Sequence, residues 1–354
     1  MFVALRDIRF ARGRFALMGS VVALITTLVV FLHGLTGGLA REASSAVAEL
    51  PAQRIVFGAP AGASPQVSFG NSTVDEQQSA AWRGAPGVRS AEPLGVAMTR
   101  LTAHGSATSV SVFGTSEALL PPLAAGAAPG DGRVAVGERT AREAGLRVGD
   151  RVTLGTREVT VSGLTADRGY GHAPSVWTTL ATWSEVSHQR QPSALAVTGG
   201  GSPAGEAART TKAVGVQDAL DGIDGYAAEH GTLSLLQGFL FVVSALVVGA
   251  FFTVWTVQRR PDIAVLKAVG ASSGYLVRDA LAQALAVLAA GTVLGGAAGA
   301  LGGGLASSAV PFELGAATVA VPVAAMVLLG LAGSALAVRR ITSVDPLTAL
   351  GAQR

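Results

Sequence analysis

The chain has no cysteine, little charge and few aromatic residues. Of its 354 residues, 14% are charged and 5% are aromatic. Without cysteine the chain has no disulfide, no thiolate metal site and no cysteine nucleophile. A soluble domain carries about 25% charged residues, so this composition points to the lipid bilayer. The net charge of +3 is too small to predict nucleic-acid binding, and aromatic and basic residues do not interleave as in proteins that bind single strands.

Motifs that would support ATP hydrolysis or a metal site are also absent. The five histidines include no His-x-x-x-His pair. A Walker A motif requires Gly-Lys-Ser/Thr, but Lys212 follows Thr211 and Lys267 follows Leu266. The sequence therefore predicts no catalytic residue, no metal site and no bound cofactor. Any ATP and Mg²⁺ that drive this protein must bind to a separate subunit.

Four apolar blocks are long enough to cross a hydrocarbon layer of ~30 Å. The predicted spans are residues 15–40, 232–257, 276–310 and 316–338. A signal peptide is the alternative for the first block, but the apolar core of a signal peptide is only about 7–15 residues long. We therefore interpret the first block as an uncleaved span.

The placement of basic residues predicts the orientation in the membrane. They gather before the first span, after the second span and in the tail: Arg6, Arg9, Arg12, Arg14, Arg259, Arg260, Lys267, Arg278, Arg339, Arg340 and Arg354. By the positive-inside rule, residues 1–14, 258–275 and 339–354 are cytoplasmic. Residues 41–231 then form a large external domain, and residues 311–315 form a short external loop. The fold class predicted is a multipass α-helical membrane protein, with one span before the external domain and three after it.

The predicted spans lack the charged residues that an ion or proton path would require. If the third span starts at Ala280, no Asp, Glu, Lys or Arg lies inside any span, so no intramembrane proton relay is predicted. The third span carries a small residue at every fourth position, namely Gly291, Gly295, Gly299 and Gly303. This spacing places them on one helix face, where backbones can approach closely. We expect packing within the chain, and a contact between two copies is the alternative.

The external domain has the patterns of a mixed α/β fold. Residues 53–58 and 109–115 favour strands, and residues 149–164 favour a hairpin that turns at Gly155-Thr156. Helices are predicted at 74–83, 139–146, 180–188 and 205–220, and a loop at 199–205.

The segment "QRRPDIAVLKAVGAS", residues 258–272, lies between the second and third spans. Pro261 fits the first position of a helix, and Asp262 complements the positive end of the helix dipole. Ile263 and Leu266 provide apolar surface, and Gly270 can end the helix in a left-handed turn. We interpret the segment as a short cytoplasmic helix that a motor protein grips. The alternative is a connector that lies on the lipid headgroups.

This segment resembles the signature of the FtsX/MacB-type permeases of ABC transporters. The matching residues are Arg259, Ile263, Ala264, Leu266, Lys267, Ala268, Gly270 and Ala271, whereas Asp262 stands where the family has Glu. "RRITSVDPLTALG" resembles the closing motif of the family, and "LRDIRFARGRF" is similar to its amphipathic first helix. "GAPGVRSAEPL" and "REAGLRVGDRVTL" resemble its periplasmic core domain.

The resemblance implies a bacterial plasma-membrane protein with both termini in the cytoplasm. It implies a homodimer that carries two copies of a separate ABC ATPase. It also implies that the motion of the ATPase reaches the membrane through a coupling surface: Arg259, Arg260, Pro261, Asp262, Ile263, Leu266, Lys267 and Gly270. Length and the segment "YGHAPSVWTTLATW" make the chain most similar to the HrtB-like (haem efflux) and DevC-like permeases.

If haem is the substrate, the chain must offer an axial ligand beside an apolar surface. Tyr226, Glu229 and His230 precede the second span, and His33 lies near the outer end of the first. Each of these residue types binds ferric haem. The alternative is that these are ordinary polar residues at a membrane interface.

The sequence therefore favours the permease subunit of an ATP-driven exporter of haem or a similar hydrophobic molecule. One alternative is extrusion of a lipid, lipopeptide or antimicrobial compound. Another is a mechanotransmitter that moves no substrate and controls an external cell-wall hydrolase or sensor.

Overall fold

A computed structural model describes residues 12–59, 62–258, 265, 269–270, 272–307 and 310–342. The chain divides into two compact units. A helical unit contains residues up to Gly38 and from Thr232 onward, and an α/β unit contains Leu39–Gly231. The predicted fold class, with an α/β domain between the first and second spans, is confirmed.

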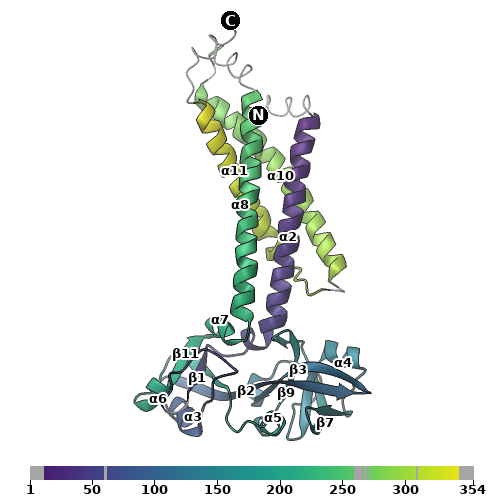
Figure 1. Cartoon of the computed structure of the whole chain (residues 1–354), viewed down its shortest axis with the longest axis vertical. Coiled ribbons are helices and arrows are strands. Elements are labelled where there is room, and N and C mark those ends of the chain that lie inside the picture. The colour runs from purple at the N-terminus through teal and green to yellow at the C-terminus, as the bar shows by residue number, and fades with distance from the viewer. Residues whose placement is uncertain are drawn as a thin grey trace. The chain divides into compact units, whose positions relative to one another are not determined.

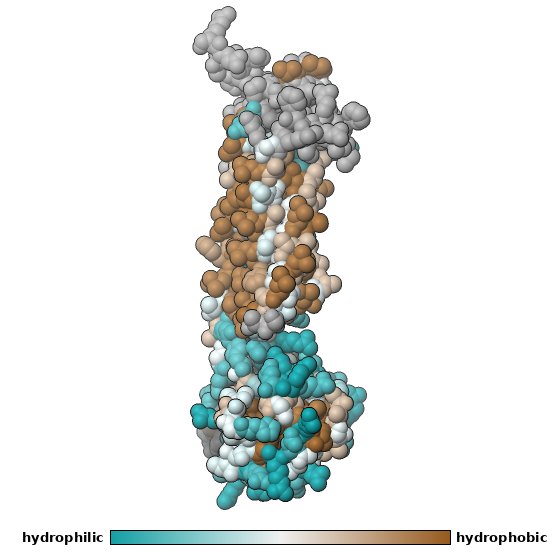
Figure 2. Space-filling model, turned by 90° about the vertical axis from the view of Figure 1, so that its right-hand side faces the viewer, coloured by the Kyte–Doolittle hydropathy of each residue, from teal (hydrophilic) through white to brown (hydrophobic). Residues whose placement is uncertain are grey.

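Four long helices carry the apolar blocks (Figure 1). They are α2 (Arg12–Ala48), α8 (Tyr226–Gln258), α10 (Ser273–Ala306) and α11 (Ala316–Thr342). Each contains a stretch long and apolar enough to cross a membrane. On the face shown in Figure 2, the described residues of the helical unit are mostly hydrophobic, while those of the α/β unit are mostly hydrophilic. Such a surface fits a hydrocarbon environment, where the helices satisfy their own backbone hydrogen bonds.

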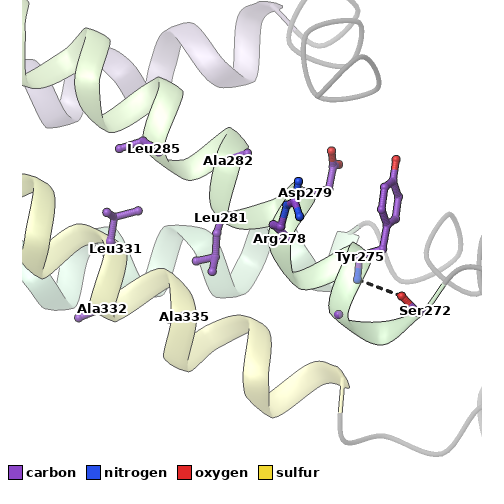
Figure 3. Close-up of a pocket in the computed structure, with 11 residues that line it drawn as sticks. Ser272, Tyr275, Arg278, Asp279, Leu281, Ala282, Leu285, Leu331, Ala332 and Ala335 are labelled. Carbon is purple, nitrogen blue, oxygen red and sulfur yellow. Dashed lines mark hydrogen bonds between the residues drawn. The ribbon is translucent and has the colours of Figure 1, made fainter.

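The helices differ from the predicted spans at their ends. α2 continues eight residues beyond position 40, and α8 starts six residues before position 232. α10 starts at Ser273 because Ser272 caps it, with the Tyr275 N–H donating to the Ser272 hydroxyl at 3.3 Å. Its apolar stretch, Val277–Ala306, includes Arg278 and Asp279 (Figure 3). The prediction that the third span contains no charged residue therefore holds only from Ala280 onward.

Three glycines of the stripe on α10 pack against α2, whereas Gly303 faces the ring of Phe312. A Cβ atom at Gly295 would lie 2.3 Å from the Ala23 carbonyl oxygen, and one at Gly299 would lie 3.0 Å from the Thr27 carbonyl oxygen. Gly291 faces Val22 in the same way. The Thr27 hydroxyl donates to the Gly295 carbonyl at 3.1 Å, which adds a hydrogen bond across this contact. The four-residue spacing therefore serves close packing within the chain.

The α/β unit is built on a mixed sheet with the strand order β11-β1-β10-β2-β3-β9-β5-β7-β4. Most neighbouring strands are antiparallel, and β3/β9 and β5/β7 are parallel. β6 pairs with β2 and β7, and β8 pairs with β9. The strands are β1 (Arg54–Gly58), β2 (Val88–Ala103), β3 (Ser106–Thr115), β4 (Leu123–Gly126), β5 (Arg133–Gly137), β6 (Arg151–Leu154), β7 (Arg157–Thr165), β8 (Gly169–Tyr170), β9 (Ala173–Thr178), β10 (Ala194–Gly199) and β11 (Thr211–Gly215).

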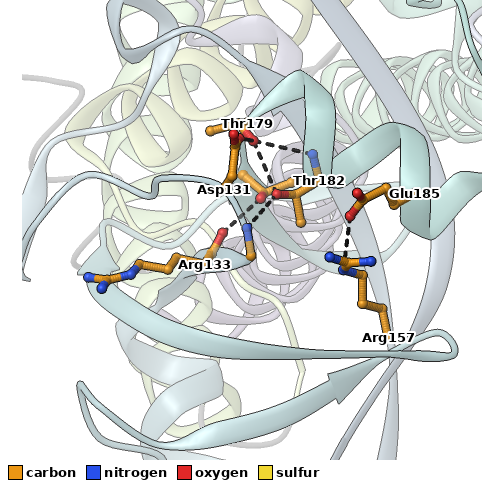
Figure 4. Close-up of polar contacts among 8 residues, drawn as sticks. Asp131, Arg133, Arg157, Thr179, Thr182 and Glu185 are labelled. Carbon is orange, nitrogen blue, oxygen red and sulfur yellow. Dashed lines mark hydrogen bonds and ion pairs between the residues drawn. The ribbon is translucent and has the colours of Figure 1, made fainter.

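Short helices and two 3-10 turns complete the unit: α3 (Glu76–Arg83), η1 (Glu117–Leu119), α4 (Glu138–Ala144), α5 (Leu180–Ser187), α6 (Glu206–Thr210), α7 (Val216–Ala219) and η2 (Leu220–Gly222). α5 illustrates how hydrogen bonds and an ion pair hold such a helix to its neighbouring strands and loops (Figure 4). Its cap Thr179 donates to Asp131 at 2.7 Å, and Thr182 accepts from the Gly132 N–H at 2.9 Å. Arg157 on β7 pairs with Glu185 at 2.9 Å.

The unit has separate apolar clusters, and β3 contributes to two of them. Phe113 belongs to the cluster that contains Phe57 and Trp177, whereas Val110 and Val112 belong to the cluster that contains Trp183. A strand reaches both clusters because successive side chains point to opposite faces of a sheet.

Most predicted elements of this unit are confirmed, and one is wrong. β1, β3, the β6–β7 hairpin, α3, α4, α5 and the loop before residue 205 lie where the patterns predict them. The helix predicted at 205–220 is instead α6, β11, α7 and η2. β11 pairs with β1, and its buried Thr211 accepts from the Trp82 indole N–H at 3.0 Å. The open edge of β1 overrides the weak helical pattern.

Candidate functional site

The first turn of α8 brings two of the predicted haem ligands together. The rings of Tyr226 and His230 stack with centroids 5.5 Å apart and planes 8° from parallel. They are four residues apart, which places them on one helix face. Tyr226 is half-buried and packs against the core of the α/β unit, while His230 is exposed. His230 is therefore the more accessible of the two as a ligand.

Glu229 makes a contact that the sequence analysis did not predict. Its Oε2 lies 2.7 Å from Nε2 of His172, and both side chains are 40% exposed. The pair puts an imidazole and a carboxylate together on the surface of the α/β unit. Both groups bind ferric iron, and both side chains are partly exposed, although Nε2 and Oε2 are in contact with each other.

The position of His172 follows from the turn between β8 and β9. Tyr170 pairs with Ala173, so Gly171 and His172 form a two-residue hairpin loop. Their φ values of 57° and 60° are both positive, as a type I′ turn requires. Histidine is one of the residue types that tolerate this region. A Gly-His pair between two short extended stretches was the sequence signal that could have identified this turn.

The same turn attaches to the end of α2. The Gly169 N–H donates to the Ser45 hydroxyl and the Gly171 N–H donates to the Ala43 carbonyl, each at 2.9 Å. Arg168 pairs with Glu49 at 2.7 Å, and the Arg168 side chain is only 15% exposed. Residues 168–172 therefore contact the C-terminal end of α2 and, through His172, the first turn of α8.

His33 has a different environment. It lies on α2 within the helical unit, where its Nδ1 is 2.7 Å from Nε2 of Gln237 on α8. The described structure thus places Tyr226, Glu229 and His230 in one unit and His33 in the other.

Most of the predicted coupling surface lies outside the described residues. These positions are Arg259, Arg260, Pro261, Asp262, Ile263, Leu266 and Lys267. Gly270 is described and has φ of 102°, a conformation that favours glycine. Ser272 lies in a Gly-x-Ser-x-Gly pattern, and its hydroxyl caps α10 by accepting from the Tyr275 N–H. Among the described residues, no three His, Asp or Glu side chains are placed to hold a metal ion.

Two family descriptions match this chain. Residues 15–223 match the MacB-like periplasmic core domain, which is more than half of the chain, and residues 234–346 match the FtsX-like permease C-terminal domain. Over 356 residues, the chain is 25% identical to a Staphylococcus haemolyticus protein named "Putative hemin transport system permease protein HrtB", with 99% of each chain covered. An uncharacterized ABC transporter permease of Mycobacterium tuberculosis is 27% identical over 356 residues, also with 99% of each chain covered.

Two solved structures are similar to parts of this chain. The extracellular domain of the noncanonic ABC-type transporter YknZ is 14% identical, with 41% of this chain and 82% of that chain covered and a TM-score of 0.33. The periplasmic region of MacB from Actinobacillus actinomycetemcomitans is 11% identical, with 48% and 90% covered and a TM-score of 0.36. The family descriptions carry the assignment, and together with four apolar helices they make this chain a multi-pass plasma-membrane permease of the MacB/FtsX family of ABC transporters, a family that implies a partner ATPase.

Proposed function

We propose that this permease exports haem or a similar hydrophobic molecule, driven by a separate ATPase. The assembly is a homodimer with two ATPase copies, and the termini and residues 258–275 face the cytoplasm. The observation that carries the proposal is the accessible Glu229, paired with His172 and adjacent in sequence to the exposed His230. Relatives over the full chain length that are named as hemin permeases support the choice of substrate.

The chemistry of the first turns of α8 fits haem. Glu229 supplies a carboxylate oxygen for the iron, and His230 is a second nitrogen ligand on the following residue. Leu233 and Leu236 follow Glu229 by four and seven residues, which is the spacing of one helix face. Leu236 is 52% exposed, so it leaves apolar surface for a macrocycle. His33 remains a candidate ligand in the helical unit.

Glu229 Oε2 lies 2.7 Å from His172 Nε2. For the iron to bind at this oxygen, the His172–Glu229 pair must open. The pair is well suited to opening, because even a fully charged pair of exposed side chains contributes only about 0–1 kcal/mol.

A haem titration of the purified full-length protein tests the proposal. We expect a shift of the Soret band with the wild-type protein. Glu229→Ala should lose at least about tenfold in affinity, since even the loss of an outer-shell partner of a metal ligand costs about 10–100-fold. His230→Ala reports on the second ligand. Glu143→Ala is the control, because Glu143 is an exposed glutamate on α4, outside this cluster. A wild-type protein that gives no Soret shift would remove haem as the substrate.

A deletion strain separates export of haem from the other functions. Under the proposal, the strain is sensitive to haem, and expression of Glu229→Ala does not restore growth. Sensitivity to a lipopeptide without sensitivity to haem would indicate extrusion of lipid-like molecules. Normal growth under both stresses, with altered cell-wall hydrolysis, would indicate a mechanotransmitter.

A further inference from the structure

The end of α2 and the start of α8 join the α/β unit in different ways. The last turns of α2 belong to that unit, and Ala46 and Val47 are buried in its core. α8 instead begins directly after Gly225, whose φ is 83°. A Cβ atom at Gly225 would meet no atom within 4 Å, so this residue has room to change its backbone conformation. The end of α2 is thus fixed by packing, whereas α8 follows a residue that can act as a joint.

Residues 168–172 lie directly on the end of α2. A Cβ atom at Gly169 would lie 1.9 Å from the Glu42 carbonyl oxygen, so only glycine allows this approach. The two backbone hydrogen bonds to α2 and the Arg168–Glu49 ion pair act on the same segment. These contacts fix the position of His172 relative to the end of α2.

The His172–Glu229 contact joins this segment to the first turn of α8. Both side chains are 40% exposed, and an ion pair between exposed side chains changes an equilibrium by no more than about fivefold. Tyr226, the residue after the joint, packs against the core of the α/β unit and keeps the start of α8 in place. A contact of this strength holds the first turn of α8 in one position and opens when a ligand competes for Glu229.

We propose that the His172–Glu229 contact is a link between α2 and α8 that substrate opens. When the iron of haem binds the Glu229 carboxylate, His172 stays with α2, and the first turn of α8 is released to move about Gly225. This inference rests on the proposed function, because haem is the ligand that opens the contact. It adds that substrate binding moves α8 relative to the α/β unit and leaves the end of α2 in place.

Spin labels on introduced cysteines test the proposal, since the chain has no cysteine of its own. Ala227→Cys places one label on the first turn of α8, at an exposed position two residues from Glu229 and therefore on a different helix face. Ser106→Cys places the second label at an exposed position on β3. The control pair combines Ser106→Cys with Arg41→Cys, at an exposed position near the end of α2. Double electron–electron resonance on the full-length protein measures the distance distribution of each pair.

The ligand for this experiment is gallium(III) protoporphyrin, a diamagnetic counterpart of ferric haem that also takes axial oxygen and nitrogen ligands. At saturation it should replace the distance between labels 227 and 106 by a different one, and leave the distance between labels 41 and 106 unchanged. The Soret band of the same samples reports whether the ligand is bound. Bound ligand without a change at label 227, or equal changes in both pairs, would overturn the proposal.

Variants open the contact without ligand. In His172→Asn, the ratio of released to held α8 should rise by up to about fivefold, the strength of the lost contact. Asparagine tolerates the φ of 60° at this position, so the turn is kept. Glu229→Ala should give the same increase and no further change with ligand. His188→Asn, at an exposed histidine with φ of 58°, should match the wild-type protein. Wild-type distributions in both His172→Asn and Glu229→Ala would contradict the link.

The outcomes separate this inference from haem export. A wild-type protein that binds neither haem nor the gallium porphyrin contradicts the export proposal. A protein that binds them without release of α8 contradicts only this inference. The thermal unfolding midpoint of each variant is measured first, and His172→Asn alone serves where Glu229→Ala does not fold.

Discussion

At the scale of single residues, His172 contacts Glu229 Oε2, the oxygen that we propose as a ligand of the haem iron. We predict that His172→Asn binds haem more tightly than the wild-type protein, because iron no longer has to displace the imidazole. The gain is at most about fivefold, since an exposed ion pair is worth no more than about 1 kcal/mol. Asparagine tolerates the positive φ at this position, so the turn is kept. Spectrophotometric titration of both proteins measures the ratio.

His188→Asn is the control for this change. His188 also has positive φ, 58°, and caps α5 away from the cluster around Glu229. The substitution His188→Asn should leave haem affinity unchanged. A weaker affinity in His172→Asn would instead assign His172 as a ligand of the iron.

Tyr170 gives a prediction for alkaline pH. Burial raises the pKa of the Tyr170 phenol above its ordinary value of 10.0, and the negative charge of Asp224 raises it further. Below pH 10 the phenol is neutral in the folded and the unfolded chain, so it adds no pH dependence. Above pH 10 the unfolded chain ionises first, and stability is lost as the pH rises.

We therefore expect Tyr170→Phe to lose less stability than the wild-type protein above pH 10. Denaturant unfolding at pH 8 and pH 11 measures the difference. Absorbance at 295 nm provides a second readout, in which Tyr170→Phe should not change the absorbance of the folded protein at pH 11, because Tyr170 is still neutral there. Identical pH profiles for both proteins would contradict the burial of this hydroxyl.

At the scale of elements, the packing of α10 on α2 depends on glycine at particular positions. Gly295→Ala should lower the thermal unfolding midpoint, because its Cβ would lie 2.3 Å from the Ala23 carbonyl oxygen and force the helices apart. Gly302→Ala is the matched control, since a Cβ there meets no atom within 4 Å. Alanine favours a helix over glycine by about 1 kcal/mol, so the control should be neutral or more stable. Equal effects in both variants would contradict this packing.

The sequence predicted elements well where a pattern is long or a turn is strongly marked. The four apolar blocks exceed the bilayer thickness, and Gly155-Thr156 separates two alternating strands, so the spans and the β6–β7 hairpin could be predicted. β11 could not be predicted, because its five residues pair with the edge of β1, which lies more than 150 residues away in the sequence. Such a pairing leaves no local signal.

Only part of the candidate site could be predicted, because the rest also depends on a contact between residues far apart in the sequence. Tyr226, Glu229 and His230 could be selected because they immediately precede an apolar block. His172 lies 57 residues before Glu229 and reaches it only through the β8–β9 turn. The fold brings the two side chains together, and no spacing in the sequence encodes that contact.

At the scale of the whole molecule, α8 carries both ends of the proposed mechanism. Its first turn holds Glu229, and its last residue, Gln258, opens the proposed coupling segment. Only 17% of its apolar stretch is buried within this chain, compared with 44% for α10. Exposed side chains such as Leu235, Phe239 and Leu246 thus leave a face for lipid or for the second copy in the proposed homodimer. In the proposed mechanism, α8 relays movement of the partner ATPase to the turn that holds Glu229.

This mechanism requires residues 258–275 and the α/β unit to lie on opposite sides of the membrane. Because the chain has no cysteine, a single introduced cysteine reports its own location. We predict that Lys267→Cys reacts with a membrane-impermeant maleimide only after the cells are permeabilised, whereas Ser106→Cys, at an exposed position on β3, reacts in intact cells. Co-expression of the partner ATPase should slow labelling of Lys267→Cys and leave Ser106→Cys unchanged, because the ATPase covers the coupling surface. Labelling of Lys267→Cys in intact cells would place that segment outside and separate it from any cytoplasmic source of ATP-driven force.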